Sequence, residues 1–424
     1  ALRQAMVDHK AKAGGVVVID AKSGEILALA NAPTYNPNNR VKLTGDQLRN
    51  RALTDTYEPG STMKPFTAAL ALEKGKVTAN TIINCAPGRM TIGSATISDA
   101  HPHGALTVAQ VIQKSSNIGA AKMALAFPPE TMWKMFDDLG FGSPLKLGFP
   151  GEVGGRLRPA KSWRPIEQAT MSYGHGISVS LMQMANAYQV FARDGDVVPL
   201  SLSRVDTPPI HGTRVFSPQT AREVRQMLEM VVQPGGTAQQ ANVPGYRVGG
   251  KTGTAEKVIN GRYSKKQVLN SFTAILPADN PQYQLLVMLD EPKALPETHG
   301  YITSGWNAVP TGGKVIARIG PLLGVEPRFD LPPSERPTES SSWKKRSNTL
   351  SRFAAGMPGP LSRTRSSADA SSWRTVSVIA PPDGVYLAAL LSRLLSDWAS
   401  RAGSPSTHRS SSGSSTVSWW PPRL

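Results

Sequence analysis

The chain of 424 residues holds one cysteine, Cys85. A single thiol excludes an intramolecular disulfide framework and a metal site built from several cysteines. The sequence also lacks an apolar run of about 18 residues, the length that predicts a membrane-spanning helix. Since the chain begins at Ala1 rather than at a methionine, we expect a fragment whose targeting segment has been removed or was never included.

Acidic residues are fewer than basic ones, and the formal net charge is +17. Residues 331–424 supply +7 of this charge (12 Lys and Arg against 5 Asp and Glu), and residues 1–330 supply +10 (35 against 25). Such a charge can attract nucleic acid, an anionic membrane or an acidic polymer. Because residues 1–330 contain no compact run of Lys and Arg, we do not expect nucleic acid as a partner.

The composition divides the chain into two parts. Residues 331–424 contain 23 serines and five of the eight tryptophans, with no sustained apolar period. A segment rich in Ser, Arg and Pro buries too little apolar surface to offset its ordering entropy. We therefore expect one globular domain over residues 1–330 and a tail over 331–424 that is disordered or is not a native continuation.

The patterns within residues 1–330 predict an α+β fold. The last strands follow one another closely, which favours an antiparallel sheet, and most helices precede them, which argues against alternating βαβ units. The expected strands lie at 14–19, 25–30, 246–258, 268–276 and 283–290, and the expected helices lie at 61–74, 107–126 with a break at its Ser-Ser-Asn, 180–192 and 217–232.

The first motif that indicates chemistry is Ser61-Thr62-Met63-Lys64, an S-x-x-K that opens a predicted helix. Residues three apart lie on one face of a helix, so Lys64 can reach the hydroxyl of Ser61. A lysine whose pKa is lowered by burial or by nearby positive charge can accept the proton of a nucleophilic serine. Taken alone, the motif is more typical of a helix N-cap followed by a surface lysine.

The second motif is Ser115-Ser116-Asn117, an S-x-N that follows the first motif in the chain and interrupts a helical pattern. By itself it is compatible with a helix cap or a turn. In a catalytic role, Ser115 would relay a proton between Lys64 and the leaving group. Asn117 would hydrogen-bond Lys64 and a substrate amide.

The third motif is Lys251-Thr252-Gly253-Thr254, which lies much later in the chain, on a predicted strand. Gly253 would let a ligand approach the backbone closely, although a Gly-rich turn is the alternative. Lys251 and the two threonine hydroxyls can bind a carboxylate. The N–H groups of Thr254 and Ser61 would form an oxyanion hole.

These three motifs in this order are typical of β-lactamases and penicillin-binding proteins. Over residues 10–328 the sequence resembles the class B penicillin-binding proteins, the monofunctional peptidoglycan D,D-transpeptidases, and most of all the cell-division group of penicillin-binding protein 3. The segments that carry the resemblance are GGVVVIDAKSGEILALANAPTYNPN, YEPGSTMKPFT, QKSSNIG, SYGHGISVS, RVFSP and KTGTAEK.

The resemblance implies a penicilloyl-serine transferase fold, in which helices flank an antiparallel sheet beside a mostly helical subdomain. It implies that the D-Ala-D-Ala end of a peptidoglycan stem peptide acylates Ser61, that an amine of a second stem peptide then forms the cross-link, and that β-lactam antibiotics trap the serine. No metal or organic cofactor is expected. The positions that match the family's motifs are Ser61, Lys64, Ser115, Asn117, Lys251, Thr252, Gly253 and Thr254.

The resemblance also implies a cellular setting. The family acts in septal cell-wall synthesis on the periplasmic face of the bacterial inner membrane, with a glycosyltransferase and other division proteins as partners. We expect the membrane anchor and most of the non-catalytic pedestal of the family to be missing from this chain.

Several alternatives remain open from the sequence. A D,D-carboxypeptidase differs only in its acceptor. A β-lactamase or penicillin sensor would share the motifs, but no convincing glutamate motif for deacylation lies between Ser115 and Lys251. An inactive scaffold fragment is disfavoured by the intact motif residues.

Four further residues are set aside. His101 and His103 flank a proline without a third ligand pattern nearby, so they predict a loop rather than a metal site. His175 lies near the substrate groove by analogy with the family, and its role stays open. The carboxylate of Glu58 is interpreted as structural.

Overall fold

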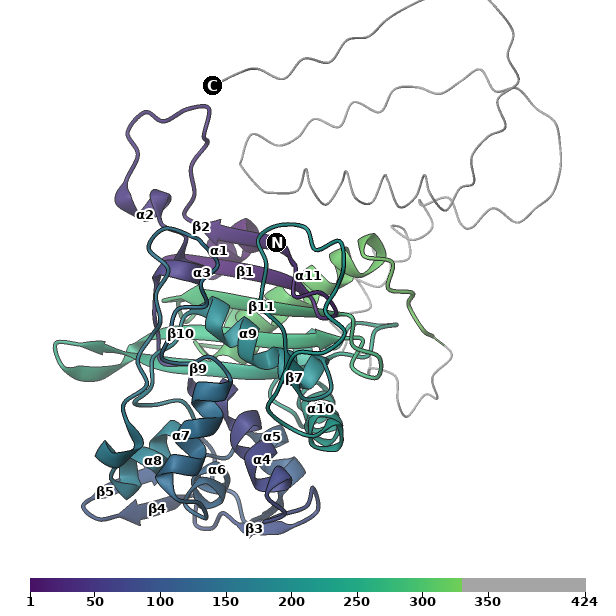
Figure 1. Cartoon of the computed structure of the whole chain (residues 1–424). Helices are drawn as coiled ribbons and strands as arrows, with labels where there is room; N and C mark the ends of the chain where they lie inside the picture. The colour runs from purple at the N-terminus through teal and green to yellow at the C-terminus, as the bar shows by residue number, and fades with distance from the viewer. Residues whose placement is uncertain (330–424) are drawn as a thin grey trace, which may run out of the picture. The chain divides into compact units, whose positions relative to one another are not determined.

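The computed structural model describes residues 1–329 (Figure 1). The expected tail, residues 331–424, lies outside this described part, so the domain boundary near residue 330 stays a prediction. Within residues 1–329, every helix is either too short or too polar to cross a membrane.

A five-stranded antiparallel sheet forms the centre of the described residues (Figure 1). Its strand order is β2-β1-β11-β10-β9, so β9 lies at one edge. An early hairpin thus pairs with the last strands of the described residues, with Val17 opposite Leu286. The strands are β1 (Ala13–Asp20), β2 (Ile26–Ala32), β9 (Gly249–Ile259), β10 (Arg262–Leu276) and β11 (Tyr283–Asp290).

The other elements are helices and short strands, and most of them lie between β2 and β9. In chain order they are α1 (Leu2–Asp8), α2 (Gly45–Leu48), α3 (Arg51–Thr54), the 3₁₀ turn η1 (Gly60–Met63), α4 (Lys64–Glu73), β3 (Ile82–Asn84), β4 (Arg89–Ile92), β5 (Ala95–Ser98), β6 (Ala105–Thr107), α5 (Val108–Lys114), α6 (Asn117–Ala124), α7 (Pro129–Asp138), η2 (Ala160–Ser162), α8 (Pro165–Met171), α9 (Leu181–Ala192), β7 (Asp196–Val197), β8 (Thr213–Arg214), α10 (Pro218–Val232), η3 (Gln239–Ala241), η4 (Pro296–Thr298), η5 (Ser304–Trp306) and α11 (Ala308–Leu322).

Helices cover both faces of the sheet. Successive residues of a strand face opposite sides; on β1, Gly14 faces Leu2 of α1 and Gly15 faces Leu181 of α9. Helix α11 lies on the same side as α1, since Lys314 pairs with Asp8 at 3.5 Å. Burial on both faces explains why β1 is a continuous apolar run rather than an alternating one.

Helix α4 is the central helix of the mostly helical part, which lies at the bottom of Figure 1. Every residue from Lys64 to Ala71 is buried. The Phe66 ring packs against Tyr188 and Phe191 of α9, at centroid distances of 5.1 and 5.2 Å. Tyr188 also donates a hydrogen bond to the carbonyl oxygen of Thr62 at 2.7 Å. The turn before α4 is thereby fixed to the helix that covers the sheet.

The α+β class and the antiparallel sheet are confirmed, while several expected boundaries shift. The strand expected at 268–276 begins at Arg262, because β9 and β10 continue as a long hairpin beyond the sheet. The helix expected at 61–74 begins as the 3₁₀ turn η1 and becomes α-helical at Lys64. The break expected within 107–126 is present, because Ser115 separates α5 from α6.

Candidate active site

Ser61 lies in η1, directly before α4. The turn is entered through Pro59 and Gly60, and the φ of +60° at Gly60 favours glycine. Gly174 packs against it so closely that a Cβ at Gly174 would lie 2.2 Å from the Gly60 carbonyl oxygen. Ser61 is therefore held at a fixed point between α4 and the segment that contains Gly174.

Lys64 is fully buried, and its side chain points back to Ser61. Its Nζ lies 2.9 Å from Ser61 Oγ, 2.5 Å from the Ser115 carbonyl oxygen and 3.0 Å from Ser115 Oγ. Burial lowers the pKa of Lys64 well below its ordinary value; the charge of Lys251 lowers it further, and Asp99 opposes the shift. A lysine in this environment is suited to accept the proton of Ser61.

Ser115 connects α5 to α6 in the left-handed conformation, with φ 60° and ψ 42°. A non-glycine residue in this region costs roughly 1–3 kcal/mol and persists where its surroundings hold it in place. The bend brings both the carbonyl oxygen and the hydroxyl of Ser115 to Lys64. The sequence predicted the interruption, but not that the backbone carbonyl would be part of the site.

Asp99 holds this bend in place. Its carboxylate accepts hydrogen bonds from the N–H groups of Asn117 and Ile118, at 2.5 and 3.0 Å, and from Ser116 Oγ at 2.8 Å. A carboxylate at a helix N-terminus satisfies unpaired donors and interacts favourably with the helix dipole. The sequence analysis missed Asp99, because a contact between residues so far apart in the chain leaves no local pattern.

Asn117 has a different partner from the one expected. Its Nδ2 donates to the carbonyl oxygen of Ser98 at 2.7 Å, and the structure does not pair it with Lys64. The amide therefore fixes β5 to α6. A contact of Asn117 with a substrate amide stays a prediction.

Lys251 reaches the same cluster from β9. Its Nζ lies 2.9 Å from Ser115 Oγ and 3.3 Å from the Thr252 carbonyl oxygen. The side chain is fully buried, and burial lowers its pKa to about 7. The structure thus connects Ser61, Lys64, Ser115 and Lys251 in one chain of hydrogen bonds, although they come from three separate segments.

The remaining residues of the third motif line the same strand. Thr252 Oγ1 lies 2.9 Å from Thr237 Oγ1, and Thr254 Oγ1 accepts the Ser304 N–H at 3.0 Å. Both hydroxyl oxygens therefore have partners that fix their positions. Their expected contacts with a carboxylate stay predictions.

Gly253 has a structural role that the sequence did not predict. A Cβ at this position would lie 2.4 Å from Ser271 Oγ and 2.9 Å from the Pro59 carbonyl oxygen. The missing side chain lets β9 pack directly against the turn of Ser61. The sequence assigned Gly253 to close approach by a ligand, whereas here the approaching group is the protein's own backbone.

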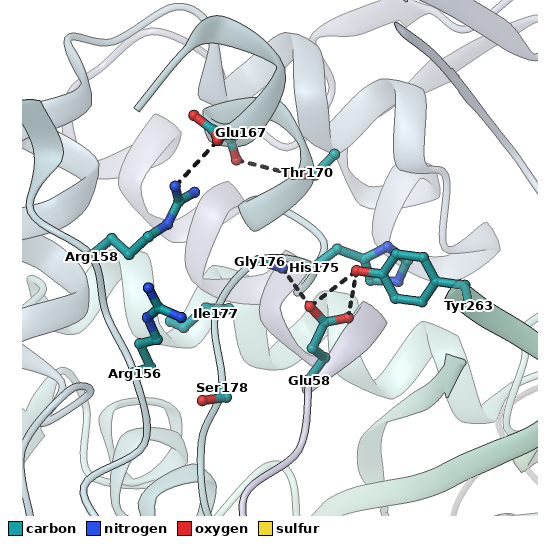
Figure 2. Close-up of a pocket in the computed structure, with 10 residues that line it drawn as sticks. All are labelled: Glu58, Arg156, Arg158, Glu167, Thr170, His175, Gly176, Ile177, Ser178 and Tyr263. Carbon is teal, nitrogen blue, oxygen red and sulfur yellow. Dashed lines mark hydrogen bonds and ion pairs between the residues drawn. The ribbon is translucent and has the colours of Figure 1, made fainter. Parts of the chain in front are cut away.

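A pocket of about 550 Å³ is lined by Glu58, His175 and Tyr263, among other residues. Glu58, three residues before Ser61, accepts the Gly176 N–H at 2.8 Å and the Tyr263 hydroxyl at 3.1 Å (Figure 2). The His175 ring stacks on Tyr263 at 5.6 Å, and burial lowers the pKa of His175. The arginines that line this pocket, Arg156 and Arg158, were not singled out from the sequence.

An antiparallel sheet between helices and a serine in contact with a buried lysine define the penicilloyl-serine transferase class. A family model described as the penicillin binding protein transpeptidase domain matches residues 14–305. The chain belongs to this family.

The relatives agree with this assignment. The chain is 44% identical over 330 residues to a probable peptidoglycan D,D-transpeptidase PenA of Neisseria gonorrhoeae, covering 78% of this chain and 55% of the relative. It is 38% identical over 328 residues to the peptidoglycan D,D-transpeptidase FtsI of Escherichia coli K12, covering 77% and 54%. The chain thus spans about half the length of these two relatives.

A solved structure of the transpeptidase domain of Burkholderia pseudomallei penicillin-binding protein 3 is also similar. Its TM-score to this chain is 0.70, at 46% sequence identity, and the match covers 78% of this chain and 94% of that one. This similarity confirms the fold of the described domain.

Proposed function

We propose that the chain is a peptidoglycan D,D-transpeptidase that cross-links stem peptides through an acyl-serine intermediate. The observation that carries this proposal is the hydrogen-bonded series from Ser61 Oγ to Lys64 Nζ, from Lys64 to Ser115 Oγ, and from Ser115 to Lys251 Nζ, with distances of 2.9, 3.0 and 2.9 Å. The names of the relatives support the same activity.

In the first half-reaction, Lys64 accepts the proton of Ser61 as Oγ attacks the carbonyl carbon of the penultimate D-Ala. The N–H groups of Ser61 and Thr254 stabilise the developing oxyanion. The C–N bond then breaks, and the terminal D-Ala leaves as an amine that takes a proton through Ser115. The products are an acyl-Ser61 ester and free D-Ala.

In the second half-reaction, the amine of a second stem peptide attacks the ester carbonyl. Its proton passes through Ser115 to Lys64, the new peptide bond forms, and the proton returns to Ser61 as the C–O bond breaks. The same groups serve both directions because the second step is the chemical reverse of the first with a different amine.

Lys251 binds the carboxylate of the terminal D-Ala in this scheme, together with the hydroxyls of Thr252 and Thr254. In the free protein, burial lowers its pKa to about 7. An anion beside it favours the charged form, so binding of the carboxylate draws a proton onto Lys251.

The geometry disfavours a β-lactamase. Hydrolysis of the acyl-enzyme needs a base to activate water, and the two carboxylates described above, Glu58 and Asp99, are engaged elsewhere. Glu58 accepts from Gly176 and Tyr263, and Asp99 accepts from the N-terminus of α6. Slow deacylation is therefore expected, as a transpeptidase that waits for an amine requires.

The cellular setting forms part of the same proposal. We place the protein in septal cell-wall synthesis, with its catalytic domain on the periplasmic side of the bacterial inner membrane. A glycosyltransferase and other division proteins are its expected partners, and β-lactams its inhibitors. Similarity to proteins named FtsI and penicillin-binding protein 3 supports this setting.

Intact-protein mass spectrometry after incubation with benzylpenicillin tests the chemistry, with Ser61→Ala as the control. A stable adduct on the wild type alone is the expected result. Consumption of penicillin without an adduct would assign a β-lactamase instead. Neither adduct nor consumption from a protein with a cooperative thermal transition would refute acyl-serine chemistry.

A further inference from the structure

The pocket that Glu58 lines holds two arginines, Arg156 and Arg158, and two carboxylates, Glu58 and Glu167, and each carboxylate already has hydrogen-bond donors of its own. Arg158 Nη1 lies 3.2 Å from Glu167 Oε1, but Arg164 shares this carboxylate through both its backbone N–H, at 2.7 Å, and its guanidinium, at 3.3 Å. The hydrogen bonds from Arg164 are the largest cause that lowers the pKa of Glu167 to about 2, so the carboxylate is charged. One carboxylate thus serves two arginines.

Arg156 places a second guanidinium in the pocket lining, and no carboxylate of the described residues forms an ion pair with it there. Within residues 1–329, the ion pairs of this region join Glu167 to Arg158 and Arg164 and leave Arg156 out. Glu58 is held on the other side of the pocket by Gly176 and Tyr263. Figure 2 shows the Arg158 guanidinium turned towards Glu167, while no ion pair is drawn to the Arg156 guanidinium.

The backbone that carries Arg156 is attached to the backbone that leads to Ser61. Arg156 pairs with Ser178 in both directions, at 2.8 and 3.1 Å, and Val179 pairs with Tyr57 in both directions, at 2.9 Å. Tyr57 lies four residues before Ser61. These hydrogen bonds fix the position of the Arg156 backbone relative to the nucleophile, so the pocket wall is pre-organised.

Arg158 is fixed in a similar way. The indole Nε1 of Trp163 donates to the Arg158 carbonyl oxygen at 3.0 Å, and the Trp163 side chain is buried. Both arginines therefore extend from restrained backbone rather than from a free loop.

The edge strand β9 indicates which part of a substrate would reach this pocket. An extended peptide can pair with an exposed sheet edge. In the proposed function, the terminal carboxylate lies at Lys251 and Thr252, and the scissile carbonyl lies at the Thr254 N–H. The peptide upstream of the scissile bond then continues along β9 towards Val258, about 13 Å beyond Thr254 at the usual rise of a strand.

A peptide that follows β9 in this direction reaches the pocket. Val258 is the register partner of Tyr263, and Tyr263 lines the pocket. The leaving D-Ala and the incoming amine use the opposite end of the strand, near Lys251. The pocket is therefore placed to contact the donor peptide upstream of the bond that is broken.

We propose that this pocket binds a carboxylate carried by the donor stem peptide upstream of its D-Ala-D-Ala end, with Arg156 and Arg158 as the binding groups. The proposal rests on the function proposed above. Guanidinium groups bind carboxylates through paired, charge-assisted hydrogen bonds and distinguish them from uncharged amides. The pocket thus selects the donor strand by charge, apart from the chemistry at Ser61.

A pair of transition-state analogues tests this selection. Both are short peptides ending in the boronic acid analogue of D-alanine, which a nucleophilic serine bonds reversibly; the residue two positions upstream carries a side-chain carboxylate in one and the matching carboxamide in the other. Their protection of Ser61 against fluorescent penicillin gives two apparent Kd values. We expect the carboxylate to bind the wild type about tenfold more tightly, in line with one charged hydrogen bond.

Arg156→Gln and Arg158→Gln should each reduce this preference to about threefold or less, and the double variant should abolish it. Arg164→Gln is the matched control, since it removes a partner of Glu167 outside the pocket lining, and it should keep the preference. Because each variant is compared with itself on two probes, a general loss of affinity or of folded protein cancels.

Equal protection by the two probes in the wild type, including no protection by either, would overturn the pocket proposal. So would a preference that survives in the double variant. The benzylpenicillin adduct of the wild type tests acyl-serine chemistry separately, so the failure of one proposal is distinguishable from the failure of the other.

Discussion

Lys64 and Lys251 converge on one hydroxyl group: their Nζ atoms lie 3.0 and 2.9 Å from Ser115 Oγ. Charging both of two buried amines this close costs free energy, because burial and like charge each disfavour the charged form. The pKa of Lys64 is accordingly well below its ordinary value, with Lys251 as a cause, and burial lowers the pKa of Lys251 to about 7.

The first prediction concerns the pH dependence of acylation. Lys64 must be neutral to accept a proton, so the rate should rise with pH in a range well below the ordinary pKa of 10.5. Lys251 must be charged to hold a carboxylate, so the rate should fall again above about pH 7 as the free protein loses that proton. Stopped-flow acylation by a fluorescent penicillin between pH 5 and 10 measures both limbs. A rate that only begins to rise near pH 10 would contradict the lowered pKa of Lys64.

The second prediction separates two adjacent serines. Ser115→Ala removes the hydroxyl between the lysines and should slow acylation by roughly 10²-fold, the lower range for a proton-transfer group. Ser116→Ala removes an N-cap and should lower the free energy of unfolding by about 1 kcal/mol, with a much smaller effect on the rate. Acylation kinetics and urea unfolding on both variants give the comparison, and equal losses of rate would remove the relay role of Ser115.

The third prediction tests the contact between β9 and η1. Gly253→Ala places a Cβ 2.4 Å from Ser271 Oγ and 2.9 Å from the Pro59 carbonyl oxygen, so the strand must move away from the turn. Overpacking of this kind costs roughly 1–3 kcal/mol of stability, and we expect acylation to fall by more than stability explains. Gly104→Ala is the control, because a Cβ there meets nothing within 4 Å. If Gly253→Ala is acylated at the wild-type rate under conditions where the variant is fully folded, the close contact between β9 and η1 is not needed for acylation.

The fourth prediction concerns Asp99. Asp99→Asn weakens the cap of α6, and the free energy of unfolding should fall by about 1 kcal/mol. The negative charge of Asp99 raises the pKa of Lys64, so its removal lowers that pKa further. The rising limb of the acylation profile should therefore move to lower pH. A shift to higher pH would mean that Asp99 acts on Lys64 by some route other than its charge.

The predictable part of the fold followed local rules. The apolar run of β1 is buried on both faces, and the Ser-Ser-Asn break separates α5 from α6, because such patterns depend on neighbouring residues alone. The extension of β10 back to Arg262 was not predictable in this way. Its residues are mostly polar, and they pair only because the facing strand β9 continues beside them.

In the candidate site, too, the features set by local sequence patterns were predictable, and those set by contacts between distant residues were not. The three motifs give the residue types that meet, and the structure adds their geometry. Asp99, which holds the bend at Ser115, and Trp163, which holds the pocket residue Arg158, act through contacts that leave no recognisable spacing in the sequence. The role of Gly253 was missed for the same reason, because it depends on contacts with residues distant in sequence. The space left by its missing side chain is filled by atoms of Pro59 and Ser271.

The contact of Gly174 with Gly60 limits how this protein can adapt. A Cβ at Gly174 would stand 2.2 Å from the Gly60 carbonyl oxygen, so a substitution at that position forces the Gly174 segment and the turn of Ser61 apart. In the proposed function, a substitution there that hinders acylation by a β-lactam should therefore also hinder acylation by the stem peptide. Under that proposal, we expect tolerated variation at positions farther from Ser61, where a side chain can change shape or charge while Ser61 stays in place.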